Sequence, residues 1–589
     1  MAYRNSDRYK KLELTWVNKD KLLAWDERKK DYVWVPVDDT RAIEPRILKE
    51  KEIVGEPSSL YDAKQKKWVK TEKPLPKEEQ NLLIRGDNLL ALKSIEDDFT
   101  RKIKLIYIDP PFNTGARINA EGEEVGYDDG YEHSIWLSMM KDRLQILRRL
   151  LRKDGAIFVH IDDLELGFLK VLMDEIFVNR NFITLITVKR SATTGHKAIN
   201  PSPVNVTDYV LAYARDKDYW NYKIQHIGRG IDKAYNRYIE NFEDKFERWK
   251  FISLSEAFCR ANGFASLSEA KKGLHEIFDD QMEEFIITNG DRVVRLALPN
   301  YKGVGKNARI TIDRSTKDSR HVFRLIRNGF SDMYFYRGQR ILFYKDKLRE
   351  IGGRFTTGEP LTNLWTDIPF QGIANEGNVV FRKGKKPEKM MKRIIEMVTK
   401  PNEWVLDSFA GSGTTGAVAH KLGRRHIMIE FAPHAETHAL KRLKSVIDGS
   451  DQTGISKDVQ WQGGGGLRYC VLGKSLFKKG PEGVIQVEYD NGDLIEAICK
   501  IEGFKFIGRQ LLGKTKLHGA VNSKRYCHIT EEFVTQDYVD QMENEIGEEE
   551  SLVIYCLRKS SRLRLPTNIY VKKIPRDLLT KSKLSVGEE

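Results

Sequence analysis

The sequence is poor in the features that mark secreted, membrane-bound and zinc-binding proteins. It contains only five cysteines in 589 residues, and no two of them form a Cys-x-x-Cys pair. Neither a zinc site nor a disulfide framework is therefore expected. No apolar stretch approaches the roughly 20 residues that a membrane-spanning helix needs, and the N-terminus lacks the apolar core of a signal peptide. These absences predict a cytoplasmic chain that binds neither metal nor membrane.

Internal repeats are absent too, and the composition is that of a globular protein, with 40% hydrophobic residues. The length predicts about two to four domains. Lysine and arginine number 99 against 85 acidic residues, which gives a net charge of +14. This excess is compatible with a polyanionic partner, and equally with a soluble protein that is merely basic.

What the sequence does contain is an alternation of short apolar runs and helical stripes. Residues 103–108 and 156–161 are apolar runs, as expected of buried parallel strands. Strands that alternate with helices predict a doubly wound, parallel α/β sheet. Apolar residues at helical spacing are Met140, Leu144, Leu147 and Leu151, followed by Gly155 as a helix stop, and then Leu164, Phe168, Leu172 and Ile176.

The same alternation returns late in the chain. A helix is predicted to begin at Pro387, and a second helix over 414–422 lies between predicted strands at 404–409 and 427–429. The intervening sequence is rich in charged and aromatic residues, and its pattern has a longer period than the α/β segments on either side. We therefore predict five segments: an N-terminal extension (1–80), a first α/β half (81–220), an inserted domain (221–370), a second α/β half (371–450) and a C-terminal domain (451–589).

A glycine-rich loop follows the predicted strand at 404–409. Gly411, Gly413 and Gly416 form the pattern Gly-x-Gly-x-x-Gly at the start of a predicted helix, and Glu430 ends the next strand. Glycines let a backbone approach a ligand closely, because a Cβ there would collide with it. An acid at the end of the second strand can accept both hydroxyls of a ribose. This context indicates a nucleotide-like cofactor rather than an ordinary tight turn.

Asp407 bears on which cofactor that is. A carboxylate at the mouth of the loop would repel the pyrophosphate of a nicotinamide or flavin dinucleotide, whereas it suits the ammonium group of an amino acid. The residue therefore favours S-adenosylmethionine, and a dinucleotide-dependent oxidoreductase is the alternative.

A second turn, Asp109-Pro110-Pro111-Phe112, follows the predicted strand at 103–108. Two prolines stiffen it and leave its carbonyls free to accept. The Asp109 carboxylate and the Pro110 carbonyl can then accept both hydrogens of one amino group, beside the flat face of Phe112. The amino group of a base is a poor nucleophile, and two acceptors favour a pyramidal nitrogen that can attack a sulfonium methyl. The base must first leave the duplex, and stacking offsets part of that cost.

Together the two turns resemble the amino-group DNA methyltransferases of the β class, in which the Asp-Pro-Pro-aromatic motif precedes the glycine motif and a target-recognition region lies between them. More closely, the chain is similar to the modification (Mod) subunits of type III restriction–modification systems. Their Asp-Pro-Pro-Tyr/Phe-Asn-Thr-Gly motif stands here as 109–115, and their Phe-x-Gly-x-Gly stretch lies within 407–415. Phe112 occupies a position where Tyr is commoner, which stacking tolerates. The resemblance covers about 81–450.

The resemblance implies a Rossmann-like methyltransferase sheet in permuted order, with a catalytic half at 81–220, a target-recognition domain at 221–370 and a cofactor-binding half at 371–450. The implied catalytic residues are Asp109, Pro110, Pro111 and Phe112. The implied cofactor-binding residues are Asp407, Phe409, Gly411, Gly413, Thr414 and Glu430, with Lys386 and Pro387 beside the methionine end and Asp87 near the adenine.

The implied function is site-specific methylation of adenine N6 in double-stranded DNA. Asp rather than Ser at position 109 favours adenine by analogy, and cytosine N4 is the alternative. A homodimer is expected. The sequence has no Walker A motif and no recognisable nuclease cluster, so any restriction requires a separate ATP-driven (Res) subunit. The same motifs also fit an orphan methyltransferase or a catalytically silent DNA-binding subunit.

Three further features have two interpretations each. Asp162 or Asp163 is expected to cap a helix rather than to take part in catalysis. The segment 191–203 is a loop that could contact DNA. The third feature is a group of basic and aromatic residues that either contacts phosphates and bases or forms a solvated basic face. Its members are Tyr336, Arg337, Arg340 and Lys345.

Overall fold

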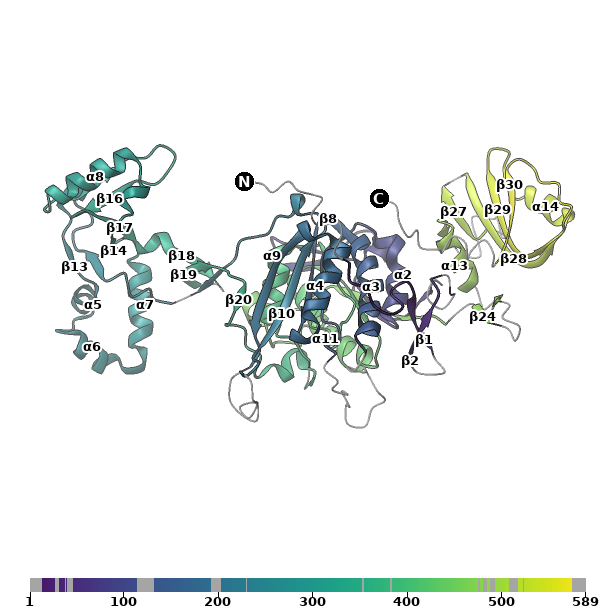
Figure 1. Cartoon of the computed structure of the whole chain (residues 1–589), viewed down its shortest axis with the longest axis horizontal. Coiled ribbons are helices and arrows are strands. Elements are labelled where there is room, and N and C mark those ends of the chain that lie inside the picture. The colour runs from purple at the N-terminus through teal and green to yellow at the C-terminus, as the bar shows by residue number, and fades with distance from the viewer. Residues whose placement is uncertain are drawn as a thin grey trace. The chain divides into compact units, whose positions relative to one another are not determined.

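The computed structural model describes most of the chain (Figure 1). The described residues form two compact units, one made of 224–362 and the other of the chain before and after it. Each unit has its own apolar clusters. The described residues are 13–26, 31–37, 39, 46–113, 132–191, 203–228, 230–351, 354–381, 384–474, 477–479, 485–487, 493–507, 517–522 and 524–574.

A ten-stranded mixed sheet organises the larger unit, in the order β20-β9-β10-β8-β7-β21-β22-β6-β23-β3. The strands from β8 to β23 in this order run parallel. β7 and β21 are neighbours although they lie far apart in the sequence, so the doubly wound sheet in permuted order is confirmed. The bounds are β3 (Leu48–Gly55), β6 (Leu82–Arg85), β7 (Ile103–Ile108), β8 (Leu151–Ile161), β9 (Phe182–Lys189), β10 (Thr207–Ala214), β20 (Leu364–Trp365), β21 (Trp404–Asp407), β22 (Arg425–Glu430) and β23 (Gly466–Leu472).

Helices cover both faces of this sheet. Ile84 and Ile429 share an apolar cluster with residues of α2, α3 and α4. Leu83 and Met428, each one residue earlier in the same strands, pack in a second cluster with α11. Successive side chains of a strand point to opposite faces, so the two clusters lie on opposite sides of the sheet. The bounds are α2 (Asn88–Phe99), α3 (His133–Leu150), α4 (Asp163–Phe177), α9 (Glu388–Val398), α10 (Thr414–Lys421) and α11 (Lys441–Ile447).

The end of α3 differs from the prediction. The helix ends at Leu150, and Leu151, predicted as its last apolar residue, instead begins β8. Gly155 therefore lies inside a strand and not at a helix end. A Cβ there would lie 2.9 Å from the carbonyl oxygen of Ile103, so glycine permits a close approach of β7 and β8 where their register shifts.

The buried face of α4 also differs. Leu164 and Phe168 are 52% and 41% exposed, whereas Leu169 and Phe177 are fully buried and Leu172 is almost so. The predicted stripe followed one edge of a wide apolar face, and helical spacing alone does not fix which edge faces the core.

The sheet extends beyond the predicted α/β halves. β23 pairs in parallel with β6, and β3 pairs antiparallel with β23. Residues up to 472 therefore belong to the sheet rather than to a C-terminal domain that begins at 451, and the N-terminal segment supplies its edge strand. Without these strands β6 would present an unpaired backbone edge.

The smaller unit, 224–362, lies within the range for which the sequence predicts an inserted domain. Its described residues form an antiparallel sheet in the order β13-β12-β14-β17-β16-β15. The bounds are β12 (Arg237–Ile239), β13 (Phe251–Ser253), α5 (Leu254–Asn262), α6 (Leu267–Leu274), α7 (Phe278–Thr288), β14 (Val293–Ala297), α8 (Lys306–Lys317), β15 (Phe323–Leu325), β16 (Met333–Tyr336) and β17 (Gln339–Phe343).

Near the C-terminus a further sheet has the order β26-β27-β28-β29-β30. Within the described ranges, no helix combines the length and the apolar character needed to cross a bilayer. The bounds of this sheet are β26 (Lys505–Phe506), β27 (Gly519–Asn522), β28 (Arg525–Val534), β29 (Ser551–Lys559) and β30 (Ile569–Lys573).

Candidate active site

The candidate site lies where β7 and β21 end side by side. The two strands are parallel, with Ile106 opposite Leu406, so the residues that follow them meet at one edge of the sheet. Asp109 comes directly after β7 and Asp407 ends β21. A pocket opens between them, and its lining residues are Tyr107, Asp109, Phe381, Gly384, Lys386, Asp407, Phe409, Ala410, Gly411, Ser412, Thr414 and Thr415.

The turn 109–112 is held by side chains from other elements. The indole N–H of fully buried Trp136 on α3 donates to the Pro111 carbonyl at 2.7 Å. Asn113 follows with φ +61°, in the left-handed region, and its amide donates to the Glu165 carboxylate at 2.6 Å. Two prolines restrict the backbone of the turn, and the contacts from Trp136 and Glu165 fix its direction.

The two oxygens of Asp109 differ in their surroundings. Oδ2 accepts from the ammonium group of Lys386 at 2.6 Å. Oδ1 is buried and accepts no hydrogen bond from any described residue. A buried acceptor without a partner is costly, so this oxygen is suited to an N–H donor that arrives with a ligand.

Phe112 lies against a buried polar chain. Its ring stacks on His160 with 5.8 Å between ring centroids. His160 Nδ1 lies 3.0 Å from the Tyr107 hydroxyl, and its Nε2 lies 3.3 Å from Asp208. Burial lowers the pKa of His160, which favours a neutral ring that accepts from Tyr107 at Nδ1 and donates to Asp208 at Nε2.

The glycines of the loop after β21 have different roles. Gly411 has φ +51°, and a Cβ on it would meet no atom of the described residues within 4 Å. Gly413 has φ +77° and a Cβ there would lie 3.0 Å from Ala439, whereas one on Gly416 would lie 2.9 Å from Met428. Gly411 therefore borders open space in the pocket, and the other two glycines permit close packing behind the loop.

Two acids secure this loop by accepting its backbone N–H groups. Asp407 Oδ1 accepts from Phe409 at 2.9 Å, and Glu430 Oε2 accepts from Gly411 at 2.7 Å. Burial raises the pKa of Asp407 to about 7. Asp407 is therefore poised to gain or lose its charge near neutral pH.

A family model described as a DNA methylase matches residues 103–441, which include both turns. The chain belongs to this DNA methylase family.

The chain is also similar to curated DNA-modification proteins. It is 35% identical over 426 residues to the probable type III restriction-modification enzyme HindVI Mod subunit of Haemophilus influenzae, which covers 67% of this chain and 54% of the relative. It is 28% identical over 379 residues to the type III EcoPI Mod subunit of Escherichia phage P1, covering 58% and 55%. It is 26% identical over 388 residues to the type II methyltransferase M.KpnI of Klebsiella pneumoniae, covering 63% and 85%. The chain spans about half the length of the two Mod subunits, and its similarity to them is confirmed.

The structure brings six of the predicted site residues to the pocket lining; they are Asp109, Lys386, Asp407, Phe409, Gly411 and Thr414. Pro110, Pro111 and Phe112 form the adjoining turn. The other four predicted residues are in neither the lining nor the turn: Asp87, Pro387, Gly413 and Glu430.

Asp87 and Glu430 are occupied by structural contacts. Asp87 is the N-cap of α2, where it accepts from Leu90 N at 3.0 Å and from the Tyr32 hydroxyl at 3.2 Å. Glu430 also accepts from Ala432 N at 3.0 Å. Pro387 is the N-cap residue of α9.

Lys386 has a contact that sequence reasoning did not assign to it. The sequence implied a place beside the methionine end of a cofactor, whereas the structure sets its ammonium group on Asp109 and 5.0 Å from the Phe112 ring centroid. Sequence reasoning did not assign six of the lining residues to the site: Tyr107, Phe381, Gly384, Ala410, Ser412 and Thr415. Phe381 and Gly384 lie in no recognised motif. The other four lie in or beside one, and only the geometry shows that they border the pocket.

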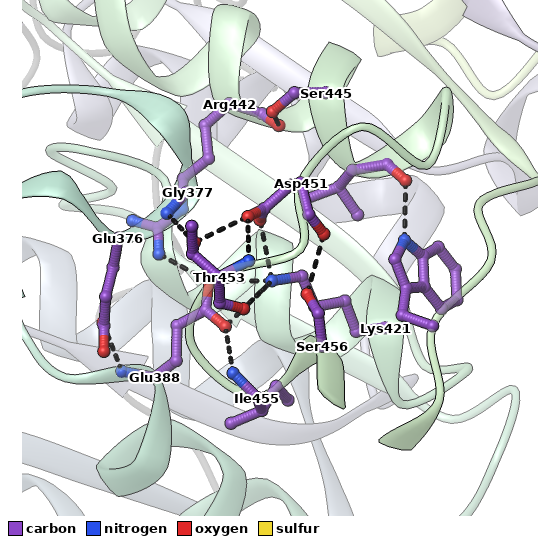
Figure 2. A network of polar contacts seen from close by, with 12 residues as sticks. Glu376, Gly377, Glu388, Lys421, Arg442, Ser445, Asp451, Thr453, Ile455 and Ser456 are labelled. Carbon is purple, nitrogen blue, oxygen red and sulfur yellow. Dashed lines mark hydrogen bonds and ion pairs between the residues drawn. The ribbon is translucent and has the colours of Figure 1, made fainter. Parts of the chain in front are cut away.

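Four buried charged side chains form a cluster (Figure 2). It adjoins the glycine loop, because Arg442 donates to the Thr414 hydroxyl. Lys421 lies 2.9 Å from Glu388 and 2.7 Å from Asp451, and Arg442 lies 2.7 Å from Glu388. Burial alone would raise the pKa of Glu388, but the charges of Arg442 and Lys421 outweigh it and lower that pKa. The cluster joins the start of α9, the end of α10 and the start of α11. No sequence motif predicts it.

The remaining predicted features have local roles or lie elsewhere. Asp162 is the N-cap of α4 and accepts from Leu164 N at 3.1 Å, so its capping role is confirmed. In the smaller unit, the guanidinium of Arg337 lies 5.0 Å from the Tyr336 ring centroid, and Lys345 pairs with Asp291. Most of the loop at 191–203, namely 192–202, lies outside the described residues.

Proposed function

We propose that this methylase transfers a methyl group from S-adenosylmethionine to N6 of adenine in duplex DNA. The observation that carries the proposal is the buried Oδ1 of Asp109, which accepts from none of the described residues and lies in the same pocket as the glycine loop. One wall of that pocket offers acceptors for an amino group, and the other offers the open backbone of Gly411 for a cofactor.

On the base side, Asp109 Oδ1 and the Pro110 carbonyl each accept one hydrogen of the target amino group. Lys386 holds the other carboxylate oxygen, so Oδ1 keeps its orientation when the base enters. The nitrogen becomes more pyramidal, and its lone pair turns towards the methyl donor. Phe112, supported by His160, offers a face on which the everted base stacks.

On the cofactor side, the residues present fit S-adenosylmethionine. Asp407 in its charged form attracts the ammonium of the amino-acid end. Gly411 allows the ligand to approach the loop, since none of the described residues has an atom within 4 Å of the place that its Cβ would take. When bound, the cofactor supplies an electrophilic sulfonium methyl.

The test is expression in a host free of DNA methylation, followed by modified-base-sensitive sequencing and nucleoside analysis. We expect N6-methyladenine at one short sequence, and none from an Asp109→Ala chain. N4-methylcytosine without N6-methyladenine would overturn the choice of base. Calorimetry that shows binding of NAD but not of S-adenosylmethionine would favour the oxidoreductase alternative, and DNA binding without any transfer would favour the silent subunit.

We further propose that the chain acts as the modification and recognition subunit of a type III-like system, in which 224–362 reads the target sequence. The support is the 35% identity to the HindVI Mod subunit. It would then form a homodimer and assemble with an ATP-driven Res subunit. Light scattering of the protein with and without duplex DNA tests the dimer, and a monomer in both states would contradict it. Restriction of unmethylated DNA that needs a co-expressed ATP-driven subunit tests the assembly; methylation without any restriction in the presence of that subunit would indicate an orphan enzyme.

A further inference from the structure

Three polar side chains form a row across one face of the large sheet, beside the turn 109–112. They are Tyr107 of β7, His160 of β8 and Asp208 of β10, and these three strands are neighbours. The residues on either side of Tyr107 and of His160 belong to the apolar cluster that includes α2, α3 and α4. Successive side chains of a strand point to opposite faces, so the polar row lies on the face away from that cluster.

The plane of the His160 ring is fixed by its two nitrogens. The ring is fully buried, with Nδ1 3.0 Å from the Tyr107 hydroxyl and Nε2 3.3 Å from Asp208 Oδ2. The other oxygen of Asp208 lies 3.2 Å from Arg190 Nη1, which holds the carboxylate in place. A buried polar atom that loses its partner is costly, so a rotation of the imidazole that breaks either contact is disfavoured.

This fixed plane is passed on to Phe112. The two rings are inclined by only 19°, with their centroids 5.8 Å apart. Phe112 is half-buried, and the second torsion of a phenylalanine has a broad energy well, so the prolines before it restrict its backbone but not its ring. Lys386 Nζ lies 5.0 Å from the same ring centroid, but a single cation does not define a plane. His160 therefore sets the orientation of the Phe112 ring.

We propose that His160, locked by Tyr107 and Asp208, is a positioning residue that presets the Phe112 ring and thereby captures the everted base. The inference rests on the proposed function, because the base is the one that is methylated. A ring that is already oriented loses little freedom when a base stacks on it, so the stacking contact offsets more of the cost of leaving the duplex. Lys386, in contrast, orients the acceptor Asp109 and acts on a base that has already been captured.

The test measures single-turnover methyl transfer to two duplexes that carry the sequence methylated by the wild-type protein. One duplex is intact, and the other has an abasic site opposite the target base, so that no base pair must open. His160→Gln keeps an amide that can reach Tyr107 and Asp208 but removes the flat ring. We expect transfer to the intact duplex to be slower by about tenfold, the order of one aromatic contact, and transfer to the abasic duplex to stay within about twofold of the wild-type rate.

Two variants separate the lock from general stability. Tyr107→Phe removes the hydroxyl that contacts His160 and should slow transfer several-fold on the intact duplex alone. Tyr213→Phe is the matched control, because this buried tyrosine of β10 donates to Asp174 at 2.7 Å but packs in the apolar cluster on the other face; it should keep both rates. Affinity for S-adenosylhomocysteine, measured by calorimetry, should stay within about threefold of the wild-type value in all these variants.

Lys386→Met gives the contrasting pattern, since a defect in orienting Asp109 should slow transfer to both duplexes alike. Equal slowing on both duplexes by His160→Gln, or no slowing on either, overturns the role in capture. A loss of S-adenosylhomocysteine affinity that matches the loss of transfer also overturns it, because a merely structural change would act on both sides of the pocket. No transfer to either duplex by the wild-type protein overturns the proposed function together with this inference.

Discussion

The turn after β7 and the loop after β21 lie at the same sheet edge but are held in different ways. The turn, 109–112, depends on side chains from distant parts of the chain, namely Lys386, Trp136 and His160. Its geometry is therefore a property of the assembled unit, and a single change far away in the sequence can disturb it.

The backbone N–H groups of the loop are held by acids of β21 and of the strand beside it. Asp407 accepts from a residue two positions on, and Glu430, at the end of the adjacent strand, accepts from Gly411. The comparison teaches that cofactor binding and methyl transfer should be separable by mutation. Changes to the distant side chains should affect transfer, whereas changes to the loop should affect cofactor binding.

The strongest separation is expected from Asp109→Ala. It removes the acceptor for the target amino group, so transfer should fall by about 10³-fold, measured by labelled methyl incorporation into unmethylated DNA. Cofactor affinity by calorimetry should change little. Asp163→Ala, an exposed carboxylate at the start of α4, is the control, and substantial transfer by Asp109→Ala would remove the assigned role.

Gly411→Val should produce the converse result. Its side chain would fill space that the cofactor needs, so cofactor affinity should fall by about 100-fold, and the positive φ of Gly411 adds backbone strain for a β-branched residue. Gly413→Ala tests the contrast within the loop, because Gly413 is not in the pocket lining and its Cβ would lie 3.0 Å from Ala439; it should lower the thermal midpoint with a smaller loss of cofactor affinity. Unimpaired cofactor binding by Gly411→Val would contradict the assignment of cofactor binding to the glycine loop.

Lys386→Met should reduce transfer by roughly 10- to 100-fold, since one charge-assisted hydrogen bond that orients Asp109 is lost. Cofactor affinity should stay within about threefold of the wild-type value, as expected for Asp109→Ala, which also alters the base side of the pocket. Lys386→Arg can restore the ion pair in part. A loss of cofactor affinity equal to the loss of transfer would place Lys386 on the cofactor side.

Cofactor affinity should also depend on pH through Asp407, whose pKa burial raises to about 7. Below that pH the carboxyl is protonated and no longer attracts the ammonium, so affinity should fall by up to about tenfold per pH unit. Above it the affinity should level off. Asp407→Asn should bind weakly with a flat profile between pH 5.5 and about 8.5, and a persistent step in that variant would assign the titration to another group.

The smallest effect is expected from Trp136→Phe, which removes the donor to the Pro111 carbonyl and little apolar volume. Unfolding free energy should fall by about 1–2 kcal/mol, and transfer by a few-fold, with cofactor affinity unchanged. Denaturant titration and the incorporation assay measure the two effects. A large loss of cofactor affinity would show that the turn and the loop are not independent.

The sequence sufficed for the two motifs and the sheet that carries them, because apolar runs that end in Asp-Pro-Pro and in a glycine loop have few structural interpretations. It did not reveal the contact of Lys386 with Asp109, since spacing along a chain says nothing about where a long side chain ends. The face of α4 was assigned wrongly for a related reason. Helical periodicity locates a stripe, but packing against the sheet decides which edge of it is buried.

The adjacency of β7 and β21 has a consequence for how the protein is made. Ile108 leaves the ribosome long before Trp404, and at about 5–20 residues per second the intervening chain takes roughly 15–60 s to synthesise. During that time one edge of β7 has no parallel neighbour and can pair with other strands. The unit at 224–362 has its own core and can fold before β21 is made and the sheet is complete. Newly made chains should therefore aggregate most readily when translation stops between the two strands.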